Sequence, residues 1–138
     1  MKLIDAHAHL NFPQFDSDRL EVIRRMKEAG VGAINVGTDR KTSRAAVQLA
    51  EENEEMWATV GLHPTDADEG FDRDFYRDLG RHPKVVAVGE CGLDYYRQRH
   101  PQQPEIFAKQ INLALELQKP LMIHCRNAFY DMIDILME

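Results

Sequence analysis

The sequence contains no long hydrophobic run. None of its apolar stretches approaches the roughly 20 residues that a helix needs to cross a bilayer. The first ten residues, MKLIDAHAHL, contain acid and imidazole groups where a secretory signal would have a continuous apolar segment. We therefore expect a protein that makes no membrane contact and resides in the cytoplasm.

Cysteine and positive charge are also scarce. Cys91 and Cys125 form no C-x-x-C pair and are too few for a disulfide framework, so we expect reduced thiols. The 17 Lys and Arg residues against 23 Asp and Glu residues give a net charge of −6. This balance argues against a protein that holds nucleic acid through a broad basic face. It does not exclude an enzyme acting on phosphodiesters, because bound metal ions can supply local positive charge.

Short apolar runs alternate with helical patterns along all 138 residues, which we expect to form one unit spanning 1–138. The runs typical of strands are residues 2–7, 31–37, 56–62, 84–90 and 120–125. The helical segments are a first helix from Asp16 or Ser17 to just before Gly30, then 42–53, 74–82, 104–119 and 128–138. In the first helix, Leu20, Ile23 and Met26 have the spacing of a buried face. Strands that alternate with helices predict βαβ units and a parallel α/β sheet.

Two architectures fit this alternation: an open doubly wound sheet and a (β/α)₈ barrel. No G-x-G-x-x-G motif follows the first strand and no Walker lysine motif is present, which disfavours nucleotide-binding versions of the open sheet. The barrel has a different difficulty. Eight βα units typically need about 250 residues, and five units fit within this chain.

Chemically active side chains gather at the predicted strand ends. In both architectures the carboxyl ends of parallel strands lie at one edge of the sheet. His7 and His9 end the first strand, and residues two apart on a strand project to the same face. Two converging neutral imidazoles suit Zn²⁺ or a related divalent cation. We predict that His7, His9, Glu90 and His124 converge on one rim, within reach of a common pair of metal ions.

Each of these residues also has an ordinary structural interpretation. An H-x-H pair arises easily by chance, and Glu90 could cap a loop or pair with Arg97. A histidine such as His124 after an apolar run is more often a satisfied residue at the edge of a core. His63, which precedes a proline, could serve only to shape a turn.

Four segments together resemble a known family. IDAHAHL, VGLHP, VGECGLDYY and PLMIHCRNAFYDMIDIL are similar to the TatD-like metal-dependent deoxyribonucleases, within the wider amidohydrolase-like barrels. The resemblance covers the whole chain in the family's order and spacing, and residues 89–96 are its most specific part. It implies a TIM-type (β/α)₈ barrel that hydrolyses phosphodiester bonds of DNA. The fold that we expect is therefore an incomplete barrel made of the first five βα units.

The resemblance also implies a role for each candidate residue. Two divalent metal ions, Mg²⁺, Mn²⁺ or Zn²⁺, are implied as cofactors. His7 and His9 would bind one ion, His124 would bind the second, and Glu90 would bridge the two as the catalytic carboxylate. Two further residues would face the substrate phosphate: His63 and Arg126.

One departure from the family pattern is large. The family places a further histidine on its sixth strand and an aspartate on its eighth, and neither strand has a counterpart among these 138 residues. We therefore expect an N-terminal portion of the enzyme that is inactive or weakly active alone. Two alternatives remain: an amidohydrolase-like enzyme that cleaves another ester or amide bond, and a non-catalytic fragment that self-associates through exposed sheet edges.

Overall fold

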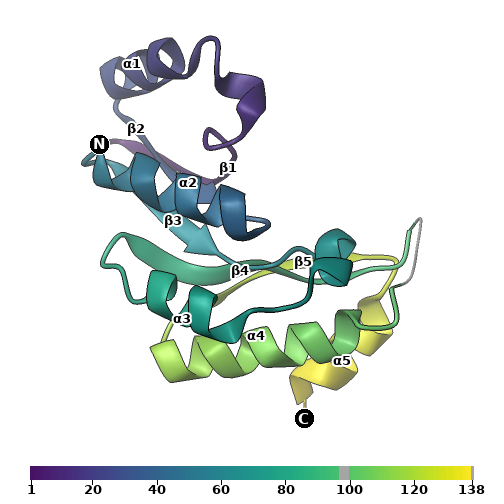
Figure 1. The fold of residues 1–138 in the computed structure, drawn as a ribbon. Helices are drawn as coiled ribbons and strands as arrows, with labels where there is room; N and C mark the ends of the chain where they lie inside the picture. The colour runs from purple at the N-terminus through teal and green to yellow at the C-terminus, as the bar shows by residue number, and fades with distance from the viewer. Residues whose placement is uncertain (97–99, 138) are drawn as a thin grey trace.

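Parallel strands followed by helices form a half-barrel in the computed structural model, which describes residues 1–96 and 100–137 (Figure 1). The five strands pair in chain order and are β1 Leu3–Ala8, β2 Val31–Val36, β3 Met56–Val60, β4 Val85–Asp94 and β5 Leu121–Arg126. The helices are α1 Arg19–Ala29, α2 Arg40–Glu51, α3 Arg73–Gly80, α4 Gln103–Leu117 and α5 Phe129–Met137, with short 3₁₀ turns η1 Pro13–Phe15 and η2 Pro64–Glu69. The predicted α/β class and the five βα units are confirmed.

Local sequence signals explain where several helices begin and end. Asp39 caps α2 by accepting a hydrogen bond from the Thr42 N–H at 2.6 Å, and the Thr42 hydroxyl caps the Asp39 N–H in return. Gly30 ends α1 in the left-handed conformation with φ 73°, which costs glycine little because it has no Cβ. These caps fix where the chain enters and leaves the strands.

The main core lies between the middle of the sheet and helices α2, α3 and α4. Tyr76, Leu113 and Phe107 are each fully buried there or in the adjoining cluster beneath α5. No helix in the described part of the chain is long and apolar enough to cross a membrane. Both cysteines are free thiols, as expected.

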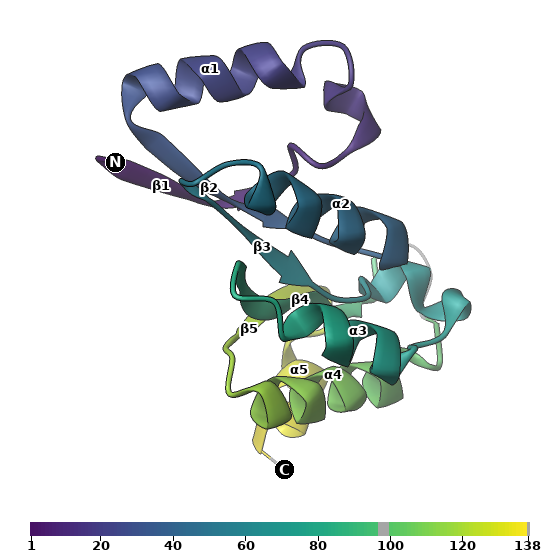
Figure 2. The same ribbon diagram turned by 60° about the vertical axis from the view of Figure 1, so that its left-hand side comes forward.

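The first helix packs less completely than its sequence predicts. Ile23 is buried at 4% exposure, whereas Leu20, which we expected to be buried, is 83% exposed. The prediction for Leu20 is wrong because α1 packs on β2, whereas Leu20 lines an open cavity between α1 and α2. Figure 2 shows α1 at one end of the sheet, with α4 and α5 at the other.

Both ends of the sheet expose apolar side chains. At the first end these are Met1, Leu3, Ile4 and Leu20, and at the second Ile123, Phe129, Tyr130, Ile133, Leu136 and Met137. Such large side chains are normally buried in a globular protein. The middle of the molecule is therefore a packed core, and the two ends are open apolar surfaces.

Candidate metal centre

The carboxylate of Glu90 lies among three histidine side chains from different parts of the sheet edge. Its Oε2 is 3.3 Å from Nε2 of His7, and its Oε1 is 3.2 Å from Nδ1 of His124 and 3.9 Å from Nε2 of His63. The Glu90 backbone N–H donates to the Gly37 carbonyl at 2.9 Å, which ties this residue to the end of β2. Glu90 is thus the central group of the cluster.

Two sets of potential metal ligands share this carboxylate. His7, His9 and Glu90 each offer an atom within 4.8 Å of the others, and so do His63, Glu90 and His124. Imidazole nitrogen and carboxylate oxygen suit Zn²⁺, Mn²⁺ and related divalent ions. The donor chemistry therefore fits a metal site on either side of Glu90.

An irregularity in β1 sets the position of its two histidines. The pairing steps from Asp5 to Ala8 on β1 while β2 advances only from Ala33 to Asn35, so β1 contains one extra residue there. The His7 N–H donates to the Asp5 carboxylate at 3.0 Å within this bulge. A bulge of this kind turns side chains at a strand end, here toward Glu90.

Hydrogen bonds assign the proton on His9. Its Nδ1 lies 3.2 Å from the Val36 carbonyl, which can only accept. The neutral His9 ring therefore has its proton on Nδ1 and leaves the Nε2 lone pair free for a metal ion.

His124 has a carboxylate oxygen beside each ring nitrogen. Its Nε2 lies 2.9 Å from Oδ2 of Asp94 and its Nδ1 lies 3.2 Å from Oε1 of Glu90, so a metal ion bound at Nδ1 would leave the proton on Nε2, where Asp94 accepts it. Burial alone would raise the pKa of Asp94, but the Tyr96 N–H and His124 hydrogen bonds outweigh it and hold that pKa below its usual value. Asp94 is therefore an ionised acceptor that orients the His124 ring.

His63 differs from both of these histidines. Its Nδ1 accepts a hydrogen bond from the Thr65 N–H at 3.2 Å and contacts the Thr65 hydroxyl at 2.7 Å. Burial and the nearby His124 lower the pKa of His63 to about 4. The ring is neutral at pH 7, and its proton sits on Nε2, the nitrogen that faces Glu90. In this state His63 donates a hydrogen bond into the site and has no lone pair for a metal ion, so Glu90 and His124 are the ligands available on that side.

Asp94 is a site residue that the sequence analysis missed. The fourth strand was expected to end at Glu90, but it continues to Asp94. Glu90, Gly92 and Asp94 alternate with Cys91 and Leu93, which are buried in the cluster under α4 and α5. This alternation was a signal in the sequence, hidden by two glycines that resemble a loop.

Two glutamines of α4 hold the backbone near the site. Gln110 accepts from the Leu62 N–H and donates to the Leu62 carbonyl, both at 2.9 Å. Gln103 does the same for Asp94, at 2.9 and 3.0 Å. Both glutamines are at most 1% exposed. Helix α4 therefore fixes the backbone at Leu62, which precedes His63, and at Asp94, which contacts His124.

Arg126 lies at the end of β5, beside Asp94 in the register. Its guanidinium is 3.6 Å from the centre of the exposed Tyr96 ring, a cation–π contact. No hydrogen bond or ion pair joins it to Glu90 or His63 in the described part of the chain. The alternative pairing of Glu90 with Arg97 lies outside the described residues. The structure thus gathers His7, His9, His63, Glu90, His124 and Asp94, with Arg126 at their margin.

Comparison with known proteins gives one consistent result. Residues 4–138 match the family described as TatD related DNase. The chain is 44% identical over 141 residues to the uncharacterized metal-dependent hydrolase YabD of Bacillus subtilis (strain 168), covering 99% of this chain and 55% of that protein. It is 41% identical over 132 residues to the 3'-5' ssDNA/RNA exonuclease TatD of Pantoea vagans (strain C9-1), covering 91% and 51%.

A solved structure agrees with these relatives. The crystal structure of YJJV, a TatD homolog from Escherichia coli K12, superimposes with a TM-score of 0.81 at 28% sequence identity. The match covers 98% of this chain and 55% of that one. The chain therefore spans about half the length of the relatives it matches.

Proposed function

The chain belongs to the TatD-related DNase family, and from this premise we propose that its strand-end cluster binds divalent metal ions and hydrolyses phosphodiester bonds of DNA. The observation that supports this most directly is the position of Glu90, whose carboxylate is common to two sets of ligands. A bridging carboxylate between two ions is a common arrangement for phosphodiester hydrolysis. His7 and His9 would hold one ion, and His124 would hold the other.

Each side chain has a defined task in this proposal. Bound ions would neutralise charge on the phosphate and lower the pKa of a coordinated water. His9 presents Nε2 and His124 presents Nδ1, each with its proton directed to a backbone or carboxylate oxygen. His63 donates from Nε2 to a phosphate oxygen, a role that its neutral state and Thr65 contact support.

Arg126 is proposed as a second donor to the substrate phosphate. The planar guanidinium suits two phosphate oxygens at once. It is exposed and stacked on Tyr96, so it can turn toward an anion without leaving a buried contact. The net charge of −6 makes such local donors necessary, because the protein has no general attraction for nucleic acid.

We propose little turnover by these 138 residues alone. Within the described residues, Glu90 and Asp94 are the carboxylates that make close contacts with the imidazole rings of the site, and both are engaged by them. Neither is free to accept a proton from an attacking water. Loss of one positioned acid–base group costs about 10²–10⁴-fold in rate.

The test is metal binding by Glu90→Gln. Titration calorimetry with Mn²⁺ and Zn²⁺ should show at least a roughly 100-fold loss of affinity. Removing a residue that only orients a metal ligand typically costs about 10–100-fold in affinity, and removing a ligand that both ions share should cost more. Glu105→Gln, at an exposed position on α4, is the matched control and should bind like the parent. Unchanged affinity of Glu90→Gln would exclude the proposed centre.

Two other functions are distinguished by direct assays. A centre that cleaves a different ester or amide bond would act on small esters and not on single-stranded DNA with the same ions. Self-association through the sheet edges is favoured by the exposed apolar side chains at both ends of the sheet. The mass of the chain in solution tests that second possibility.

A further inference from the structure

An exposed aromatic ring, that of Tyr96, lies just beyond the carboxyl end of β4. The residue is 52% exposed, although most of the area of a large aromatic side chain is usually buried. The guanidinium of Arg126, at the end of β5, lies 3.6 Å from the centre of this ring. Both side chains are exposed, so this contact belongs to the surface of the protein and not to its core.

Strand geometry places this pair beside the metal centre. His124 and Arg126 are two residues apart on β5, so their side chains project from the same face of the sheet. Two residues along a strand span about 7 Å. Asp94 pairs with Arg126 in the register and contacts His124 through its carboxylate. The Tyr96 ring is therefore within reach of a nucleoside whose phosphate is held at the metal centre.

The backbone that carries Tyr96 is held by hydrogen bonds. The Tyr96 N–H donates to Oδ1 of Asp94 at 2.9 Å, and Oδ2 of the same carboxylate lies 2.9 Å from Nε2 of His124. The Tyr95 N–H donates to the Arg126 carbonyl at 2.9 Å. One carboxylate thus positions both a proposed metal ligand and the residue with the exposed ring. A side chain that is positioned in advance loses less conformational freedom when a ligand binds to it.

A flat ring beside a planar cation is suited to stacking. Aromatic rings and arginine guanidinium planes are the surfaces on which unpaired bases of nucleic acids stack. In the proposed function Arg126 turns toward a phosphate oxygen, and this movement uncovers the ring face that its guanidinium covers in the free protein. A base of the same strand can then take that place without displacing a buried group.

We propose that Tyr96 stacks on an unpaired base of the substrate strand, that of the nucleotide next to the phosphate at the metal centre. Arg126 covers this face of the ring in the free protein and leaves it when the strand binds. This inference rests on the proposed function for the choice of nucleic acid, and it adds a residue that holds the base. Because every base has a flat π-face, the contact does not read sequence.

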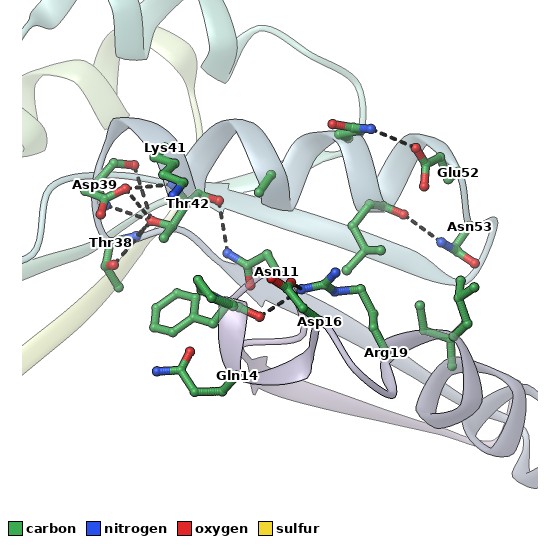
Figure 3. A pocket seen from close by; sticks show the side chains of 17 residues that line it. Asn11, Gln14, Asp16, Arg19, Thr38, Asp39, Lys41, Thr42, Glu52 and Asn53 are labelled. Atoms are coloured by element: carbon green, nitrogen blue, oxygen red, sulfur yellow. Dashed lines mark hydrogen bonds and ion pairs between the residues drawn. The ribbon is translucent and has the colours of Figure 1, made fainter.

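A second surface near the metal centre is a cavity of about 760 Å³ between the segment after β1 and helix α2 (Figure 3). The side chains labelled in Figure 3 are polar or charged, and Asp16 among them pairs with Arg19 at 2.7 Å. The Phe12 ring in the cavity wall is half-buried and packs against His9, with the ring centres 4.4 Å apart. The exposed ring of Tyr96 is therefore the more open surface for a base.

The experiment compares two unlabelled oligonucleotides that have the same phosphates, a deoxyadenosine tetramer and its abasic counterpart. Calorimetry in chelator should show that the parent chain binds the adenine tetramer about tenfold more tightly, the effect of one stacked base. Tyr96→Ala should weaken only the adenine tetramer and bring the ratio of the two affinities to about one. Tyr96→Phe, which keeps the ring, should retain the tenfold ratio. Tyr130→Ala, at a tyrosine that is 82% exposed on α5, is the matched control.

The outcomes separate this proposal from the one before it. Arg126→Ala should weaken both tetramers equally, because they share the phosphate contact; a ratio lost in that variant and kept in Tyr96→Ala would overturn the role of Tyr96. Equal affinities of the parent for the two tetramers, or no binding of either at millimolar concentration, would also overturn it. Equal loss in Tyr130→Ala would overturn its location. Stacking needs no metal ion, so a tenfold ratio would support Tyr96 even if Glu90→Gln bound metal like the parent.

Discussion

The middle of the molecule and its two ends differ in how they are held. Strands β2 to β4 have neighbours on both sides and helices α2 to α4 packed against them, whereas β1 and β5 each have one neighbour in the described sheet. The proposed centre draws on both regions. Glu90 and His63 come from the middle, and His7, His9 and His124 come from the edge strands.

Because of this difference, the core of the protein holds some residues of the site in position and not others. Glu90 and Asp94 belong to β4, whose outer face is buried, so the core holds them in position. The edge histidines depend on hydrogen bonds to that middle region: His9 on Val36, and His124 on Asp94. The middle of the sheet thus supplies Glu90, which both proposed ligand sets share, and the acceptors that orient His9 and His124.

The largest expected effect is on stability. Leu113→Ala, at a fully buried position of α4, should lower the free energy of unfolding by about 2–5 kcal/mol. Leu20→Ala on α1 is the matched substitution at an exposed position and should change it by less than about 0.5 kcal/mol. Urea denaturation measures both. Equal losses would mean that α1 is packed as firmly as the middle.

A second substitution tests whether the middle orients an edge ligand. Asp94→Ala removes the carboxylate that orients the His124 ring through Nε2 and should weaken Mn²⁺ binding by about 10–100-fold. Asp94→Asn retains a carbonyl oxygen for His124 and should restore part of the affinity. Asp78→Ala, at an exposed position of α3, is the control. Calorimetry that finds identical affinity in all three variants would remove Asp94 from the site.

The open ends should also make the chain self-associate. Ile133→Glu places a charge on the exposed apolar face of α5 and should weaken association by about tenfold. Asp134→Lys changes a charge on the same helix without removing apolar surface. Sedimentation at several concentrations compares them. A parent chain that stays monomeric throughout would contradict this expectation.

The smallest effect is on pH dependence. Because the pKa of His63 is about 4 when folded and about 6.5 when unfolded, the unfolded chain binds more protons between these values. This residue's contribution is present above pH 6.5 and is lost as the pH falls toward 4. His63→Gln should therefore flatten the decline in unfolding free energy over that range, measured by urea denaturation with chelator. An unchanged slope would show that folding does not lower the pKa of His63.

Much of this arrangement was predictable because parallel strands share one carboxyl edge. The spacing of His7 and His9 and the positions of Glu90 and His124 after strands were enough to place them together. Asp94 was missed because Gly89 and Gly92, with φ of 143° and 135°, interrupt the apolar alternation of a strand that nevertheless continues.

Other features depend on what surrounds a segment. The spacing of Leu20, Ile23 and Met26 indicates an apolar stripe along α1. A local pattern does not show whether another element packs on that stripe. Sequence periodicity predicts faces, and tertiary packing decides which faces are buried.

The two glutamines of α4 have a consequence for the dimensions of the site. Gln103 and Gln110 are seven residues apart, close to two helical turns or about 10 Å along the axis. Gln103 forms hydrogen bonds with the backbone of Asp94, and Gln110 forms them with the backbone of Leu62, the residue before His63. The distance between the ends of β3 and β4 is therefore set by the rise of helix α4 as well as by the pairing of the two strands. Sliding α4 along its axis would carry both ends in the same direction and leave their spacing intact.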